Sequence, residues 1–230
     1  MTPTSKLPRY SLVAVLLLAS AGQAAAASVV YSSRALFDAA TTNQTLRTFE
    51  GLAPIEGFTL YDGGLTVNGV TFTSLPTLTQ PVGNRILVVD GGFCNCGGYF
   101  FNSGQWLNDN TTPSNTHVTL PAGTMAWGAD LSELNSTLQD ITISMSTGEV
   151  FTVSHPDQPN FAFFGVTSAV PITVVDFTFA TQSGQPTFSS LALDNFVTAD
   201  LAGTSPVPEP ATLILLCTGL AAAIGRRRQL

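Results

Sequence analysis

The sequence predicts an all-β protein, built as an antiparallel β-sandwich with one short helix near its start. From residue 41 to residue 200 the chain is a series of short segments rich in Val, Ile, Thr and Phe, separated by Gly, Pro, Asn and Asp. It has no second helical pattern, no alternation of strands with helices and no internal repeat. Hydrophobic residues make up 44% of the sequence, which is enough for a core and too much for a disordered chain.

The elements follow in order along the chain. A helix is predicted over residues 32–40, where a serine N-cap precedes Leu36, Phe37 and Ala40 on one face. Strands are predicted at 46–50, 65–73, 85–90, 117–120, 125–131, 140–145, 149–154, 172–180 and 188–198. Turn residues separate several of them, at Asp62-Gly63-Gly64, Asn68-Gly69 and Ser146-Thr147-Gly148. Short strands at this spacing are typical of a sandwich.

The distribution of charge excludes nucleic acid as a partner. Five of the eight basic residues lie near the ends of the sequence, at Lys6, Arg9 and 226–228. Between residues 28 and 205 the chain has 14 acidic residues but only three basic ones, Arg34, Arg47 and Arg85, which leaves a net charge of −11. Such a surface repels a phosphate backbone.

Residues 1–27 have the three parts of a secretory signal peptide. Lys6 and Arg9 form a positive leader, residues 12–21 form an apolar run, and the small residues of 23–27 suit signal peptidase. We expect cleavage before Ala27 or Ser28 and export across the inner membrane. An uncleaved anchor is the alternative, but the apolar run is shorter than the ~20 residues that a membrane span needs. The sandwich domain is then expected over residues 28–200.

Residues 201–230 are organised as a Pro-rich linker, a short membrane segment and a basic end. Prolines at 206, 208 and 210 keep residues 201–210 extended and accessible, because proline stops a helix. Residues 211–224 are apolar and form a short, marginal span, so we expect 211–225 to contact the membrane transiently. The three arginines that follow would stay on the cytoplasmic side, and the domain would face outward.

The sequence Val207-Pro208-Glu209-Pro210, the apolar stretch and the arginine cluster together resemble the PEP-CTERM sorting signal of Gram-negative bacteria that produce exopolysaccharide. The resemblance implies recognition by an exosortase, cleavage near the motif, and a membrane-anchored intermediate that ends at the cell surface or in the extracellular matrix. It assigns the sorting signal to Pro208, Glu209, Pro210, Arg226, Arg227 and Arg228.

A second resemblance covers roughly residues 30–198. Short motifs recur in the same order in many PEP-CTERM proteins, at 33–40, 48–54, 69–72, 163–166 and 193–196. The region is similar to jelly-roll, galactose-binding-like domains, which is the architecture of many carbohydrate-binding modules. The resemblance implies a jelly-roll sandwich, and exopolysaccharide is the ligand that we consider for it.

Trp106 is the candidate ligand-binding residue. It lies in the polar, loop-like stretch 100–110, among Asn, Asp and Gln. An indole ring there could stack on a sugar while nearby amides bond the sugar hydroxyls. The alternative is a residue at the rim that packs on the edge of a sheet.

Cys94 and Cys96 are predicted to form a tight disulfide. Export favours a disulfide because the periplasm is oxidising. The paired glycines on either side allow the sharp turn that brings residues i and i+2 within bonding range. A metal clip, a free thiol pair and a redox site are the alternatives.

Asp194 suggests a structural calcium site. Alternation places Asp194 on the face of Ala192 and Phe196, and Asn195 on the opposite face, with apolar residues on both faces. A carboxylate there is costly unless it is paired or bound to a cation, and calcium accepts carboxylate and amide oxygens. The resemblance to jelly-roll modules that hold calcium places Glu50 opposite Asp194, with Asn195 as a weaker ligand. The alternative is that Asp194 caps a turn or pairs with an arginine.

The sequence contains no familiar catalytic motif. His117 and His155 are its only histidines, best explained as exposed or satisfied, and neither His-Glu-x-x-His nor Gly-x-Ser-x-Gly occurs. The 14 acids leave open a carboxylate pair for glycoside hydrolysis. We therefore predict an exported, non-catalytic protein of the cell envelope or extracellular matrix that binds exopolysaccharide. The alternatives are a secreted polysaccharide-degrading enzyme and a purely structural matrix protein.

Overall fold

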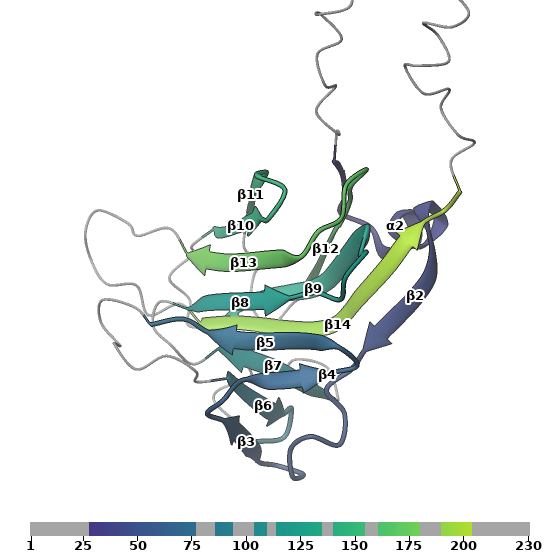
Figure 1. Ribbon diagram of the computed structural model, residues 1–230. Coiled ribbons are helices and arrows are strands. Elements are labelled where there is room, and N and C mark those ends of the chain that lie inside the picture. Colours follow the sequence, from purple (N-terminus) through teal and green to yellow (C-terminus); the bar gives the residue numbers. More distant parts are fainter. Residues whose placement is uncertain are drawn as a thin grey trace, which may run out of the picture. The chain divides into compact units, whose positions relative to one another are not determined.

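The computed structural model describes residues 28–76, 86–93, 104–109, 114–134, 140–154, 161–179 and 190–203 (Figure 1). Residues 26–202 form one compact unit. The predicted signal peptide, the predicted sorting tail, Cys94 and Cys96 lie outside the described residues. Within the described ranges, no helix has the length and apolarity needed to cross a membrane.

The described residues form two antiparallel sheets. The first has eight strands, in the order β1 (Val29–Tyr31), β12 (Ala162–Thr167), β9 (Ala126–Leu134), β14 (Ser190–Leu201), β7 (Gln105–Asp109), β6 (Ile86–Asp90) and β3 (Phe58–Tyr61), with β2 (Thr41–Arg47) also paired to β14. The second has six strands, in the order β11 (Val150–Val153), β10 (Ile141–Met145), β13 (Val174–Phe179), β8 (Asn115–Thr119), β5 (Val70–Ser74) and β4 (Leu65–Val67).

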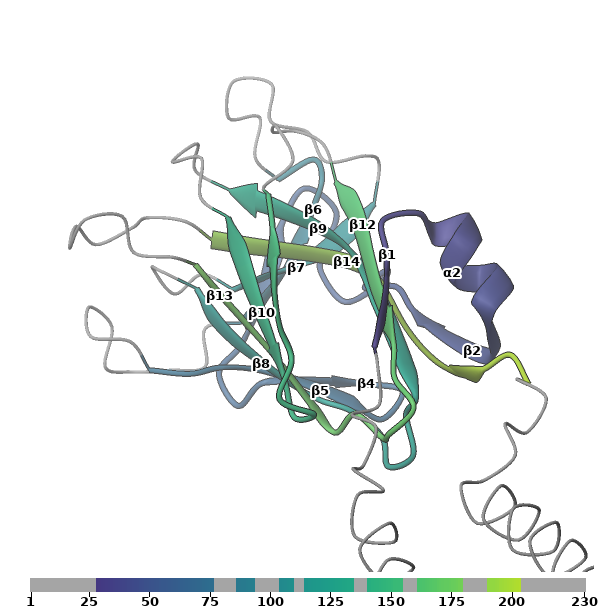
Figure 2. The same cartoon turned by 90° about the horizontal axis from the view of Figure 1, so that it is seen from above.

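The chain passes repeatedly from one sheet to the other. The strands β7, β9, β12 and β14 belong to the first sheet, whereas β8, β10, β11 and β13, which lie between them in the sequence, belong to the second. The two sheets form two facing layers (Figure 2). This arrangement confirms the predicted all-β, antiparallel, jelly-roll-like sandwich with one short helix.

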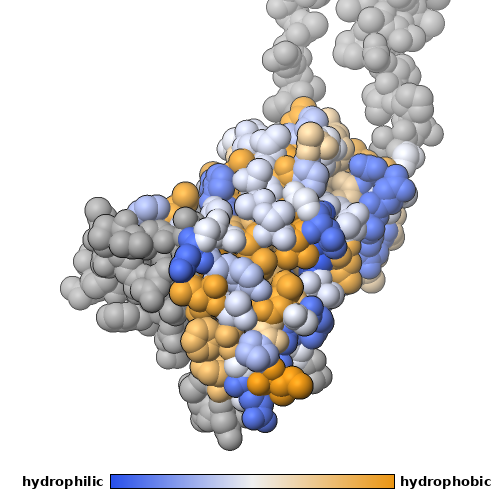
Figure 3. All heavy atoms as spheres, turned by 60° about the horizontal axis from the view of Figure 1, so that its bottom comes forward, coloured by the Kyte–Doolittle hydropathy of each residue, from blue (hydrophilic) through white to orange (hydrophobic). Residues whose placement is uncertain are grey.

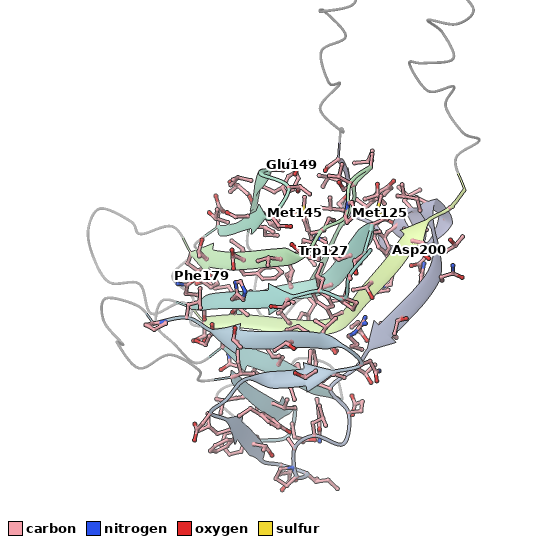
Figure 4. The ribbon with its side chains drawn as sticks, viewed as in Figure 1. Met125, Trp127, Met145, Glu149, Phe179 and Asp200 are labelled. Atoms are coloured by element: carbon pink, nitrogen blue, oxygen red, sulfur yellow. The ribbon has the colours of Figure 1, made fainter. Side chains whose placement is uncertain are left out.

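The main core lies between the two sheets and uses the alternating apolar positions of their strands. Trp127 of β9 is fully buried in it. Its ring stacks on Phe196 of β14, with 5.9 Å between centroids and 9° between planes, and meets Phe177 of β13 edge-on at 5.6 Å. Its indole N–H donates to Met145 Sδ of β10 at 3.3 Å (Figure 4). Trp127 therefore contacts strands of both sheets and links the two layers.

The helix α2 (Arg34–Ala40) buries one side chain. Phe37 is fully buried against Tyr31 and Phe163, whereas Leu36 is 64% exposed. The prediction that Leu36 shares the buried face with Phe37 is therefore wrong. Consecutive helical residues point about 100° apart. A helix of seven residues that packs through Phe37 leaves its neighbour in solvent.

Four strands are missing from the sequence-based prediction, namely β1, β3, β7 and β12, and β2 begins before the predicted segment 46–50. β2 reads Thr-Thr-Asn-Gln-Thr-Leu-Arg with its five central residues exposed, and β7 reads Gln-Trp-Leu-Asn-Asp with every residue buried. Sequences this polar form strands because β14 and β6 supply their backbone partners. Local composition does not reveal such long-range pairing.

Candidate functional site

Asp194 lies where β14 changes its partner strand. On one side β14 pairs with β9. On the other side it pairs with β7 through residues 191–193 and with β2 through 196–201, so neither of these two ladders includes Asp194 or Asn195. A bulge occurs here, because Asn195 has a φ of 49° and the register with β9 shifts between Asp194 and Val197.

The bulge changes which side chains of β14 face the core. Phe196 lies in the core with Leu191 and Leu193, whereas Ala192 lies in a separate apolar cluster. Val197 packs in a third cluster, with the buried residue of α2. The expectation of strict alternation along this strand is therefore wrong, since a bulge inserts one extra residue and reverses the faces beyond it.

Five residues around the bulge form a group that we name the Asp194 cluster, consisting of Arg34, Glu50, Asp130, Asp194 and Asn195. The backbone N–H of Asn195 donates to Asp194 Oδ1 at 2.6 Å. Asn195 Nδ2 donates to Asp130 Oδ2 at 2.9 Å and to Asp194 Oδ2 at 3.3 Å. Arg34 Nη2 donates to Asn195 O at 2.9 Å and pairs with Asp130 Oδ1 at 3.3 Å. Asp194 thus caps the bulge, and the nearby arginine is bonded to Asp130.

The surroundings of Asp194 disfavour its charge. Burial raises the pKa of the Asp194 carboxyl to about 6, although the backbone N–H of Asn195 acts in the opposite direction. The negative charges of Asp130 and Glu50 raise this pKa further, and the positive charge of Arg34 lowers it. The cluster therefore holds a carboxyl group that titrates close to neutral pH.

Glu50 lies close enough to Asp194 for its negative charge to raise the pKa of the Asp194 carboxyl. Both carboxylates, however, accept hydrogen bonds from groups of the protein. Glu50 Oε1 accepts a hydrogen bond from the backbone N–H of Gln105 at 3.0 Å, and both Asp194 oxygens accept from Asn195. Within the described ranges, no group of three or more His, Cys, Asp or Glu side chains is arranged to hold a metal ion. Calcium at Glu50, Asp194 and Asn195 stays a prediction, and identical melting in excess calcium and in chelator would reject it.

We expect Asp194→Asn to stabilise the protein at neutral pH. The folded-state pKa of about 6 lies above 3.8, the ordinary pKa of an aspartate carboxyl. The native carboxyl therefore keeps its proton while the unfolded one loses it, and the free energy of unfolding falls as the pH rises from about 4 to 6. Asparagine removes this loss, with a gain of about 1–2 kcal/mol at pH 7.5 after allowance for solvent screening.

The measurement is chemical denaturation of both proteins in chelator at pH 4 and at pH 7.5. The gain should appear at pH 7.5 and vanish at pH 4. Asp62→Asn, at an exposed turn, is the matched control and should show no gain at either pH. An equal gain at both pH values would contradict the assigned titration.

The sequence suggested that Trp106 lies on a loop. The structure places it on the strand β7, so this expectation is wrong. Trp106 is 8% exposed and packs with Val89 and Ala192 on the face of the first sheet that points away from the main core. Its cross-strand neighbour is Val89, and the cross-strand neighbour of Val89 is Phe58 of the edge strand β3. These three residues form a row, because cross-strand partners share a face. The indole is at the buried end of this row, since its strand lies inside the sheet, between β6 and β14.

Phe58 and Phe93 form an exposed aromatic pair at the edge of the first sheet. They are 48% and 45% exposed, and their rings meet edge to face with 4.9 Å between centroids. Figure 3 shows hydrophobic residues at this lower end of the molecule, where β3 lies. The sequence-based prediction misses Phe58, because it includes no strand over Phe58–Tyr61 and only the pairing order reveals that β3 is an edge strand.

A fixed carboxylate lies close to the aromatic pair. Asp90 Oδ1 accepts hydrogen bonds from the backbone N–H groups of Gly92 at 3.0 Å and Glu56 at 3.1 Å. These two bonds lower the pKa of the Asp90 carboxyl, so it is ionised at neutral pH. Exposed apolar rings beside an oriented hydrogen-bond acceptor suit a ligand that has both apolar faces and hydroxyl groups.

The histidines have no catalytic arrangement that the described residues reveal. His117 of β8 lies opposite Asp176 of β13, with 2.6 Å between Nδ1 and Oδ1. Both side chains are partly exposed, so the pair is a surface contact between neighbouring strands. His155, Cys94 and Cys96 lie outside the described residues, and the disulfide stays a prediction.

Comparisons with solved structures find weak likenesses to carbohydrate-binding modules. A family 29 module complexed with mannohexaose is 11% identical with a TM-score of 0.35, over 62% of this chain and 90% of that chain. A second structure of a family 29 module is 11% identical with a TM-score of 0.36, over 74% and 99%. A TM-score this low does not establish a shared fold, so the sandwich assignment rests on the strand pairing. A search of the curated proteins finds no match.

The sequence itself matches one family profile, the PEP-CTERM protein-sorting motif, over residues 206–229. The match includes the predicted Pro208-Glu209-Pro210 and the arginines at 226–228. The resemblance to a PEP-CTERM signal is therefore confirmed, and the roles of the individual residues stay a prediction. The match indicates a secreted protein with a C-terminal sorting signal of the PEP-CTERM type.

Proposed function

We propose that this protein is a non-catalytic component of the cell envelope or extracellular matrix that binds exopolysaccharide through its β-sandwich. The observation that carries the proposal is the PEP-CTERM motif at residues 206–229. In this proposal signal peptidase removes residues 1–27, and an exosortase then cuts near Pro208-Glu209-Pro210 and discards the membrane segment. The sandwich reaches the surface or the matrix without its basic end.

We expect Glu209→Ala to prevent this processing. Glu209 is the charged residue of the motif, and an enzyme that recognises it loses a charge-assisted contact when the carboxylate is removed. The variant should accumulate as a longer, membrane-retained species, as intact-mass measurement of membrane and surface fractions would reveal. Glu56→Ala, an exposed glutamate of the sandwich, is the control and should be processed normally. A wild-type surface form that still contains Arg226–Arg228 would contradict the proposal.

The exposed aromatic pair supports the polysaccharide part of the proposal. Sugar rings have apolar faces that stack on aromatic side chains, and Phe58 and Phe93 offer two exposed rings. The ionised Asp90 beside them can accept hydrogen bonds from sugar hydroxyls. These residues take the role of ring platform that sequence reasoning gave to Trp106.

We expect the processed protein to be retained on exopolysaccharide from the producing cells without cutting it. Replacing Phe58 and Phe93 together by alanine should weaken retention at least about tenfold, since two stacking contacts are lost. Leu36→Ala removes an exposed apolar side chain from α2, outside the aromatic pair, and should leave retention unchanged. Release of reducing ends would favour the polysaccharide-degrading alternative, and absence of retention would favour a purely structural matrix protein.

A further inference from the structure

A polar cleft of about 310 Å³ lies on a different part of the sandwich from the aromatic pair. It is bordered by β2, by the end of β14 and by two turns, and we name it the Arg47 cleft. Its lining residues include Asn43, Thr45, Arg47, Pro121, Thr124 and Asp200. Figure 3 shows hydrophilic residues gathered along the side of the molecule where Figure 1 places β2.

The cleft exists because three irregular backbone segments diverge at this point. The ladder between β14 and β2 shifts register between Thr198 and Asp200, and Asn43 opposite the shift has a φ of 51°. The turn between β4 and β5 contributes Asn68, with a φ of 45°, and the turn after β8 contributes Gly123, with a φ of 84°. Side chains do not fill the space between these segments, so a hollow open to solvent results.

Arg47 fixes the walls of the cleft. Its guanidinium donates to Thr45 O at 2.6 Å on its own strand, to Asn68 O at 2.8 Å on the β4–β5 turn, and to Thr198 Oγ1 at 2.8 Å on β14. It is 2% exposed, and no acidic residue within the described ranges forms an ion pair with it. Burial accordingly lowers its pKa. The guanidinium therefore acts as a rigid brace between three elements.

The remaining polar groups leave hydrogen-bonding capacity toward the cleft. Asn43 Nδ2 donates to Asp200 Oδ2 at 3.0 Å, which orients both side chains at the rim. The other oxygen of Asp200 and the hydroxyl of Thr45 have no hydrogen-bond partner among the described residues. Figure 4 shows Asp200 toward the far end of β14, beside β2 and away from the buried Trp127. Pro121 adds a small apolar wall.

We propose that the Arg47 cleft binds one neutral sugar residue, with Asp200, Asn43 and Thr45 hydrogen-bonded to its hydroxyls and Pro121 against its apolar face. The volume is at the small end of ligand pockets, which suits a single ring. The ligand is neutral because Asp200 and the acidic surface of the domain repel a uronate, while Arg47 is already occupied by backbone carbonyls. This inference deepens the proposed polysaccharide binding and rests on it.

The test is titration of isotopically labelled, processed protein with methyl glycosides of glucose, galactose and mannose, and with glucuronate, followed by amide chemical shifts. At least one neutral glycoside should shift the amides of Thr45, Thr124 and Asp200 in a saturable way. Asp200→Ala and Thr45→Val should each raise the dissociation constant about threefold to tenfold, the loss of one or two hydrogen bonds.

Matched controls are Asp62→Ala and Thr152→Val, an exposed acid and an exposed strand threonine outside the cleft. They should leave the dissociation constant unchanged. Absence of saturable shifts with every neutral glycoside, tighter binding of glucuronate, or equal losses in the controls would each overturn the cleft proposal. Retention on exopolysaccharide is measured in parallel. If the protein is retained on exopolysaccharide but no neutral glycoside binds in the cleft, the cleft proposal is wrong and the proposed function stands. If a glycoside binds in the cleft but the protein is not retained, the proposed function is wrong.

Discussion

Replacing Trp127 by alanine should lower the free energy of unfolding by about 3–5 kcal/mol, the usual cost of removing a large buried aromatic side chain. Trp127 is fully buried and contacts Phe196, Phe177 and Phe164 at centroid distances of 5.9, 5.6 and 5.7 Å. Alanine leaves a cavity between the two sheets and removes the donor to Met145 Sδ. A domain of this size is stable by only about 5–15 kcal/mol, so one substitution would remove a large share.

Chemical denaturation of the processed protein measures this loss. Trp127→Phe keeps most of the ring contacts and should recover more than half of the stability. Leu36→Ala removes an apolar side chain that is 64% exposed and should change the stability by less than about 0.5 kcal/mol. A Trp127→Ala protein that loses less than about 1 kcal/mol would contradict the position of Trp127 in the core.

Replacing Arg47 by methionine should cost about 2–4 kcal/mol, although no ion pair of the described residues is lost. The guanidinium bonds the backbone carbonyls of Thr45, Val67 and Asn68 and the hydroxyl of Thr198. Methionine fills a similar volume but leaves these acceptors without their donors. Lysine should rescue little of the loss, because one ammonium group cannot reach acceptors on three elements in the planar geometry of a guanidinium.

The matched control for Arg47 is Arg34→Met. Arg34 is partly exposed, pairs with Asp130 at 3.3 Å, donates to Asn195 O at 2.9 Å and lies over the Phe163 ring at 4.6 Å. Its loss should cost about 1–2 kcal/mol in denaturation experiments, less than the loss of the fully buried Arg47. A cost for Arg34→Met equal to that for Arg47→Met would contradict the role of Arg47 as the buried brace. Full rescue by Arg47→Lys would show that a point charge, and not the shape of the guanidinium, stabilises this region.

Features that are encoded by neighbouring residues in the sequence, such as a linear motif or an alternating pattern, could be predicted from the sequence. The sorting signal is a linear motif, so Pro208-Glu209-Pro210 and the following arginines were recognisable without a fold. The all-β class was also predictable, because residues such as Ile141, Ile143, Val175 and Phe177 alternate with polar ones and all four are buried.

The candidate sites depended on contacts between distant segments, and the sequence predicted them poorly. Trp106 lies among polar residues in the sequence, yet β6 and β14 flank its strand and bury it. Phe58 lies in a strand that the sequence did not predict, and the edge position of that strand leaves its side chain exposed. Local composition reports what a side chain prefers, whereas burial is decided by which strands lie beside it.

By itself, the sequence determined that this protein carries a PEP-CTERM sorting motif, is acidic in its middle and is built from strands, because each of these properties follows from composition or from residues that are adjacent in the chain. Only the tertiary structure decided the bulge at Asn195, the aromatic pair and the Arg47 cleft. The bulge requires β14 to change its partner strand, and the cleft requires β2, β14 and two turns to meet. A single residue shift in strand pairing moves every later side chain to the opposite face, so such sites arise from register, which local sequence does not determine.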